Sequence, residues 1–368
     1  MWCGVATMVD RLLSGPTGHR RVLVATLRLQ ELHRLDTDTD SDRLTDETRR
    51  RVLAAVTTRI DLKRRFTPDE LTRAHSLDAD PRIAEALTRT DEYGLPEYLA
   101  AGPQLLDRWR NGTAPGTTPR GAALVTAAIE CRRAGYSSPL PRALLEELHT
   151  DFLEPRSRPE DLDQAWTWAT TPWRDTTALL EPVDDTHVTV FDYLVDHTQR
   201  TTPPGSPPSE KLILTALNHA PARDCAMLGG NATDTGRYQL AYTAYSRALT
   251  LYVDPDDPNT LSSRNNLANA LDKMGRYNEA EVEHRIVLET RTRVLGPEHP
   301  GTLTSRNNLA QALAEMGRYD EAEAENRAVL EAFTRVLGPE HPYTLTSRNN
   351  LVIALIELGR FSEAEAEL

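Results

Sequence analysis

Apolar residues recur at helical spacing through the C-terminal part of the chain, and the pattern returns every 42 residues. Apolar positions at i, i+3, i+4 and i+7 indicate one buried face of an α-helix. One copy carries two such stripes around a Gly-Arg-Tyr segment, first Leu303, Leu309, Leu313 and Met316, then Ala322, Ala328 and Leu330. Each copy therefore predicts two helices joined by a short turn.

The copies align through residues that recur 42 positions apart. These are Arg264, Arg306 and Arg348, the Asn-Asn doublets that follow them, and Gly275, Gly317 and Gly359. The glycines stand where the first helix must end, a place that favours the left-handed backbone conformation. Two helices with one apolar stripe each cannot bury it alone, so the copies are expected to stack into a solenoid.

A degenerate earlier copy precedes the regular ones. Residues 236–261 align with the later turns and second helices, but their loop is three residues shorter. The first helix of this copy matches poorly and contains a Gly229-Gly230 pair, which is unfavourable inside a helix. The repeat units are expected near residues 218–257, 258–299, 300–341 and 342–368, the last of them truncated.

The order of Leu, Gly, Tyr and Ala within each unit resembles the tetratricopeptide repeat. The residues beyond the usual length of about 34 lie in RVLGPEHPGTL and RVLGPEHPYTL, which resemble the long variant of this repeat found in kinesin light chains. The resemblance implies a superhelical solenoid that binds a protein or a peptide in its concave groove.

In that family the fifth position of the first helix faces the groove, and here it is Asn265, Asn307 or Asn349. Side-chain amides in such a column can hydrogen-bond the backbone of an extended peptide. The other residues implied for the groove are Ser262, Asn269, Lys273, Thr304, Gln311 and Thr346. A second interpretation stays open, in which the amides satisfy only one another and nearby backbone groups. The repeated arginines are expected to form ion pairs with acidic neighbours rather than to hold a peptide.

The front of the chain carries a different signal. HRRVLVATLRLQEL, residues 19–32, predicts a short buried strand at residues 22–25, and short helical segments punctuated by proline follow it. This order resembles the end of the nucleotide-binding domain in bacterial signal-transduction ATPases of the STAND class. The resemblance implies that Thr26 and Arg28 sense the γ-phosphate of a nucleotide.

The P-loop G-x-x-x-x-G-K-[ST], which such a domain needs to hold a nucleotide, does not occur in the sequence. No nucleophile with its base can be assembled from a local motif either, so no enzymatic activity is expected. The sequence looks like an internal segment or a truncated product of such an ATPase, with residues 1–60 as a remnant of the α/β domain. In the alternative, another chain supplies the missing strands.

Between these two parts, residues 61–200 predict a helical module, with a winged helix as one possible form. A proline-rich linker at residues 201–212 separates it from the repeats at residues 213–368. Trp166, Trp168 and Trp173 are interpreted as a local core, with stacking on a base or a peptide as the alternative. The acidic and histidine residues between Asp184 and His197 alternate with apolar ones, so no metal site is expected there.

Composition narrows the choice of partners. The 42 basic and 55 acidic residues give a formal net charge of −13, which repels nucleic acids and anionic membranes. Three separated cysteines suggest neither a disulfide framework nor a zinc site, and no apolar run is long enough for a membrane span. Almost all basic residues are arginine, as in GC-rich bacterial genes.

The sequence therefore predicts a mainly α-helical protein with a C-terminal tetratricopeptide solenoid, a helical middle module and a short α/β remnant. We expect a cytoplasmic, regulatory scaffold that binds a protein or a peptide without a metal or cofactor. Self-association through the truncated end of the solenoid is a further contact that the sequence suggests.

Overall fold

The computed structural model describes residues 68–77, 101–114, 117–155, 157–173, 177–203 and 205–367, with isolated positions at 79, 83–84 and 87–88. All of these belong to one compact region, Arg64–Leu368. The predicted strand at residues 22–25 and the implied sensor residues Thr26 and Arg28 lie outside the described residues.

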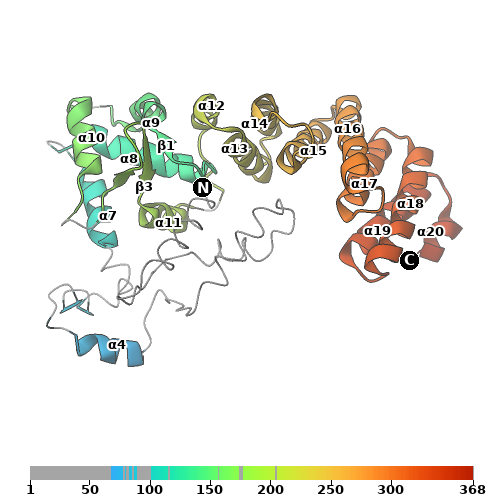
Figure 1. Ribbon diagram of the computed structural model, residues 1–368, viewed down its shortest axis with the longest axis horizontal. Coiled ribbons are helices and arrows are strands. Elements are labelled where there is room, and N and C mark those ends of the chain that lie inside the picture. Colours follow the sequence, from blue (N-terminus) through green and yellow to red (C-terminus); the bar gives the residue numbers. More distant parts are fainter. Residues whose placement is uncertain are drawn as a thin grey trace, which may run out of the picture. The chain divides into compact units, whose positions relative to one another are not determined.

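A module of helices around a small sheet forms the first part of this region (Figure 1). Helix α4 (Pro68–His75) precedes it. The module consists of α7 (Gly102–Asn111), α8 (Pro119–Arg133), β1 (Leu140–Pro141), α9 (Arg142–Leu148), the 3-10 helix η1 (His149–Phe152), α10 (Leu162–Thr170), β2 (Leu180–Pro182), β3 (His187–Val190) and α11 (Asp192–Thr201). The strands are antiparallel in the order β1-β3-β2, with Leu140 opposite Val188 and Leu180 opposite Val190.

Helix α8 is the centre of this module, because its side chains are buried around most of its circumference. Its N-terminus carries no side-chain cap of its own. Instead the Glu160 carboxylate accepts hydrogen bonds from the backbone N–H groups of Gly121 at 2.8 Å and Arg120 at 3.2 Å. A negative charge at this end also complements the helix dipole, so a residue far along the chain fixes where α8 begins.

The tryptophans pack inside the module, as the sequence predicted. Trp166 is buried, and its indole N–H donates to Glu146 at 2.8 Å. Trp168 lies so close to α8 that a Cβ at Gly121 would sit 2.5 Å from its ring. The guanidinium of Arg108 lies over both Trp168 and Trp173, which ties α7 to α10.

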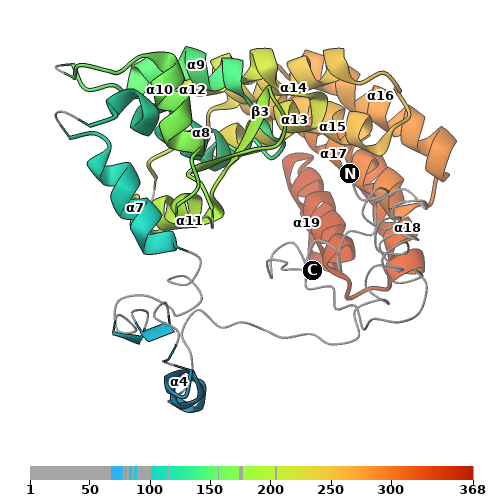
Figure 2. The same ribbon diagram turned by 60° about the vertical axis from the view of Figure 1, so that its left-hand side comes forward.

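The rest of this region consists of α12 and four consecutive pairs of helices. They are α12 (Glu210–His219), α13 (Ala222–Asp234), α14 (Tyr238–Leu251), α15 (Pro258–Lys273), α16 (Tyr277–Leu295), α17 (Pro300–Glu315), α18 (Tyr319–Leu337), α19 (Pro342–Glu357) and α20 (Phe361–Glu367). From α13 to α20 each helix packs on the next, and α17 also contacts α19 (Figure 2). The chain is thus mainly helical with a C-terminal solenoid, as predicted.

The ends of the helices explain why the units are so regular. Gly236, Gly275, Gly317 and Gly359 have φ values of 70°, 74°, 75° and 73°. This confirms the left-handed conformation expected between the two helices of each unit. The next unit begins at an N-cap residue, Asp257, His299 or His341, whose side chain accepts a hydrogen bond from a backbone N–H of the first turn.

Ion pairs join the helices within and between units. Arg264 pairs with Glu283 at 2.7 Å, and Arg306 pairs with Glu325, so both connect the two helices of one unit, as expected, for two of the three repeated arginines. The arginine of each turn reaches the preceding unit as well. Arg318 donates to Glu281 at 2.8 Å, whereas Arg276 lies over the ring of Tyr242, which occupies the corresponding place one unit earlier.

A buried carboxylate joins the module to the first unit. Asp224 of α13 is fully buried and accepts hydrogen bonds from the backbone N–H groups of Ser137 and Ser138 and from the Ser137 hydroxyl at 2.6 Å. These residues form the turn after α8. One hydrophobic cluster runs without interruption from Ala101 to Ala280, so the module and the first units share a core.

The proline-rich segment between α11 and α12 is held in place by two arginines. Arg133 donates to the Ser206 carbonyl at 3.0 Å, and Arg237 donates to the Pro208 carbonyl at 2.7 Å. Of residues 201–212, Thr201 belongs to α11, and α12 begins at Glu210. Backbone carbonyls in this segment therefore connect α8 with the turn that precedes α14.

The Gly229-Gly230 pair has a packing reason at only one of its two positions. A Cβ on Gly229 would lie 2.8 Å from the ring of Tyr245, which is buried. A Cβ on Gly230 would meet only the Tyr245 hydroxyl, at 3.9 Å. The close approach of α13 and α14 therefore requires glycine at position 229 and leaves space for a side chain at position 230.

This difference predicts opposite effects of two neighbouring substitutions. Gly230→Ala is expected to raise the free energy of unfolding by about 0.5–1 kcal/mol, because alanine is the better helix former. Gly229→Ala is expected to lower it by about 1–3 kcal/mol, because the methyl group must displace a buried ring. Urea unfolding of the full chain measures both, and a stabilising effect at position 229 would contradict the packing described here.

Candidate peptide-binding surface

The nine residues that the sequence analysis implied for a groove all lie on the first helices of the units. We call this surface the first-helix face. Helix α15 carries Ser262, Asn265, Asn269 and Lys273, α17 carries Thr304, Asn307 and Gln311, and α19 carries Thr346 and Asn349. None of the nine is buried, and Ser262, Lys273, Gln311, Thr346 and Asn349 are exposed.

Asparagines join the first helices of neighbouring units. The Nδ2 group of Asn308 donates to Oδ1 of Asn265 at 3.0 Å, and Nδ2 of Asn350 donates to Oδ1 of Asn307 at 3.1 Å. Asn265 and Asn307, each the first residue of its doublet, thus accept a bond from the following unit, and Asn308 and Asn350, each the second residue, donate to the preceding unit. We call these two bonds the asparagine ladder.

The ladder uses only the carbonyl oxygen of the Asn265 and Asn307 amides. Among the described residues, no hydrogen bond uses the Nδ2 groups of Asn265 or Asn307. Because their carbonyl oxygens are held by the next unit, these two amides present N–H donors rather than acceptors. The interpretation in which the amides satisfy one another therefore describes their oxygens and leaves their nitrogens available.

The hydroxyl groups of the first-helix face are used differently from the amides. Thr304 and Thr346 donate to the carbonyls of Pro300 and Pro342, each at 2.9 Å, within their own helices. Their hydroxyl protons are therefore used internally, although their oxygens can still accept a bond. The donors that remain on the first-helix face are chiefly the amide groups and the Lys273 ammonium.

Sequence reasoning missed the role of the second asparagine in two of the three doublets. Asn308 and Asn350 fix the orientation of the groove amides, although neither was among the implied groove residues. The signal was present, since Asn265-Asn266, Asn307-Asn308 and Asn349-Asn350 recur as doublets. Recognising it required knowledge of which face of each first helix meets its neighbour.

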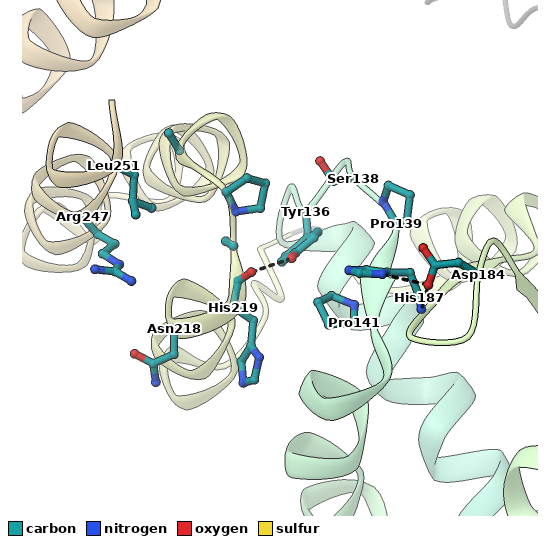
Figure 3. A pocket seen from close by; sticks show the side chains of 13 residues that line it. Tyr136, Ser138, Pro139, Pro141, Asp184, His187, Asn218, His219, Arg247 and Leu251 are labelled. Carbon is teal, nitrogen blue, oxygen red and sulfur yellow. Dashed lines mark hydrogen bonds and ion pairs between the residues drawn. The ribbon is translucent and has the colours of Figure 1, made fainter. Parts of the chain in front are cut away.

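A second concave site lies where the module meets the first unit (Figure 3). It has a volume of about 720 Å³ and is bounded by the turn after α8, the tip of the β2–β3 hairpin, the α12–α13 connection and α14. Figure 3 shows Arg247 and Leu251 on one side and His187 with Asp184 on the other, with His219 between them.

Several polar groups of this pocket already have partners. His187 lies 3.1 Å from Asp184, and His219 lies 3.1 Å from Glu147. Hydrogen bonds from Thr186 and His187 hold the pKa of Asp184 well below its usual range. The pocket therefore offers less unsatisfied hydrogen-bonding capacity than the first-helix face, and we regard the latter as the better candidate site.

Two other kinds of site find no support in the part of the chain that the structure describes. No group of three or more histidine, cysteine, aspartate or glutamate side chains is arranged to hold a metal there. None of the helices in this part is both long and apolar enough to cross a membrane.

The ladder predicts a measurable coupling between Asn265 and Asn308. A double-mutant cycle with Asn265→Ala and Asn308→Ala is expected to give about 0.5–1.5 kcal/mol of interaction energy in urea unfolding. The cycle removes the effect of each substitution on helix propensity. Asn265 and Asn349, two units apart and without a shared partner, form the control pair and should show no coupling. Equal coupling in both cycles would contradict the ladder.

The repeats match the model of a known family. A family model described as the tetratricopeptide repeat matches residues 223–285, 273–331 and 308–368. A solved structure of a putative kinesin light chain from Podosopora anserina with nearly identical TPR-like repeats is 23% identical, with a TM-score of 0.37, and the match covers 48% of this chain and 79% of that one. BtubC (BKLC) from P. vanneervenii is 21% identical, with a TM-score of 0.35 and coverage of 43% and 67%.

The apo form of RapI is 15% identical, with a TM-score of 0.36, and the match covers 40% of this chain and 52% of that one. A sequence comparison with curated proteins found no match. On the evidence of the family model and the helix pairs, residues 223–368 of this chain are tetratricopeptide repeats.

Proposed function

We propose that this chain is a scaffold that binds a protein or a peptide through the first-helix face. The observation that carries the proposal is the pair of unused amide donors on Asn265 and Asn307, which stand at the same position in consecutive units. Solenoids of this kind use the surface formed along their repeats for binding. The site residues are the nine that make up the first-helix face.

The asparagine ladder gives the amides a useful property for binding. A free asparagine side chain rotates and loses this freedom when it binds a ligand, which lowers affinity. Here the neighbouring unit holds each carbonyl oxygen in advance, so part of that ordering has already occurred in the free protein. The aligned N–H donors suit the backbone carbonyl oxygens of an extended peptide.

The surface residues of the module that precedes the repeats favour a protein partner over DNA. Its order of helix, strand, two helices and two strands, with β3 in the middle of the sheet, favours the winged helix that the sequence suggested. Helix α10, in the place of a recognition helix, contains no lysine or arginine and carries Asp163. The hairpin tip carries Asp184 and Asp185. Lysine and arginine neutralise the phosphates of DNA, and this helix and this hairpin tip carry acidic side chains instead.

We further propose that the scaffold is regulatory, non-enzymatic and cytoplasmic, and that its source is bacterial. The domain division that goes with this proposal is residues 1–60, 61–200, 201–212 and 213–368. The shared core and the arginines that hold the proline-rich segment favour a module and solenoid that act as one body.

Selection of peptides tests the binding proposal. A phage-displayed library of random twelve-residue peptides is panned on the full chain, and the best peptide is synthesised with a fluorescent label. The variant Asn265→Ala/Asn307→Ala is expected to bind it at least about tenfold more weakly, because two hydrogen bonds of about 1 kcal/mol are lost. Fluorescence anisotropy measures the dissociation constants.

The control replaces two amides on second helices, Gln239→Ala/Asn278→Ala, both exposed. This variant should bind the peptide like the original chain. A peptide that binds all three proteins equally, or a library that yields no peptide, contradicts the proposal.

A second candidate function is a nucleotide-driven switch of the STAND type, in which Thr26 and Arg28 sense a nucleotide held by sequence outside this chain. The topology of the module favours it, because such a module is expected between a nucleotide-binding domain and the repeats. Binding of fluorescent ATP with Mg²⁺ is measured with this chain alone and with the product of the neighbouring gene. The switch requires binding only in the mixture, and weaker binding with Arg28→Ala; no effect of Arg28→Ala contradicts it.

A further inference from the structure

The units differ from one another on the first-helix face in a systematic way. The hydroxyl column (Ser262, Thr304, Thr346) and the amide column (Asn265, Asn307, Asn349) stay nearly constant along the solenoid. Two other columns change from unit to unit, namely Asn269, Gln311 and Ile353, and Lys273, Glu315 and Glu357. The constant columns suit the backbone of a ligand, which is the same at every residue, and the variable columns suit its side chains.

An apolar site appears at one end of this surface. Ile353 is 48% exposed, and Ile356 is 45% exposed. The position of Ile353 remains open even where another unit follows, because Gln311 occupies it in the preceding unit and is exposed although α19 packs on α17 and α18. The exposure of Ile353 therefore belongs to this column of the first-helix face. The position of Ile356 is half-buried in the preceding units, as Asp272 and Ala314 show, so Ile353 is the open apolar side chain of this face and forms a seat for an apolar ligand group.

Charge changes along the same surface. Lys273, Glu315 and Glu357 are exposed, and among the described residues none of the three has an ion-pair partner. Each lies four residues after a member of the other variable column, so the two columns are neighbours on the helix surface. The face is therefore positive beside Asn269, negative beside Gln311, and both apolar and negative beside Ile353.

Resting on the proposed function, we infer that the ligand of the first-helix face is an extended peptide with opposite chemistry at its two ends. One end lies over α15 and carries an acidic side chain that meets Lys273. The other end lies over α19, places an apolar side chain on Ile353, and carries a basic side chain beside Glu357. Packed helices are about 8–10 Å apart, so two steps span roughly 20 Å, or about six extended residues.

The library selection described above is extended to test this inference. Peptides are selected on the original chain and on two variants, Ile353→Gln and Lys273→Glu, and all proteins are first compared by thermal unfolding. Glutamine is the residue that the preceding unit carries at position 353, and this site is exposed, so Ile353→Gln should leave the melting temperature unchanged. Lys273→Glu removes a positive charge from the last turn of α15 and should lower the melting temperature only slightly. The pool from the original chain should contain an acidic residue about six positions from an apolar residue with a neighbouring lysine or arginine.

The best peptide and a copy with serine in place of its apolar residue are then titrated against each protein. For the original chain, the serine copy should bind at least about tenfold more weakly. For Ile353→Gln, the two peptides should bind alike. The Lys273→Glu pool should replace the acidic residue with a basic one.

The outcomes separate this inference from the proposed function. If selected peptides need Asn265 and Asn307 but show no apolar position and no charge pattern, the inference is wrong and the binding function stands. If they do not need these asparagines, the proposed function fails as well. If Ile353→Gln instead changes the mass in sedimentation while the peptide pool is unaltered, the apolar seat is a contact between copies of the chain, and the inference is wrong.

Discussion

Two helices with one apolar stripe each cannot bury these stripes without neighbours, and this constraint determines how the units of the solenoid pack. Within one unit, Leu303 packs with Val329 and Phe333. The second helix of each unit also covers the first helix of the next, as Leu330 does for Leu351 and Leu355. The first of these clusters lies within one unit and the second joins two units, so apolar packing rather than the polar groups on the surface fixes the spacing of the first helices.

The polar contacts between units follow the register that this packing sets. Ion pairs such as Arg318 with Glu281 are partly exposed, and pairs of this kind add little to stability. These contacts all have the same direction along the solenoid, because the arginine of each turn contacts the preceding unit. The asparagine ladder acts in the same way on the other side of the helices. It adds modest energy, but it fixes the orientation of the amides that we propose for ligand binding.

The module prevents the first unit from exposing its own apolar stripe. The fully buried Asp224 satisfies the turn after α8, and the proline-rich segment supplies a carbonyl to Arg237, where later turn arginines find a side chain. The solenoid thus begins on a surface shaped to receive it. The module therefore fixes the position of the first unit, from which the first-helix face extends along the solenoid.

Local patterns in the sequence predicted the parts of the structure that depend on neighbouring residues. The glycine turns, the two helices of each unit and the pairing of Arg264 and Arg306 follow from residues close in the chain or from the repeat. The sequence could not predict contacts between remote residues, such as Asp224 with Ser137, 87 residues apart, or Glu160 with the start of α8. Nor could the sequence predict that only the carbonyl oxygens of Asn265 and Asn307 have partners, because this depends on which face of α17 meets α15.

The central claim is that the amide groups of Asn265 and Asn307 are donors held ready for a ligand. The most direct test is to follow the side-chain NH₂ signals of the asparagines by ¹⁵N NMR while the selected peptide is added to the full chain. We expect the signals of Asn265 and Asn307 to shift with saturation at the measured affinity, while the signal of Asn278 stays in place. A peptide that saturates the protein without moving either signal would contradict this claim.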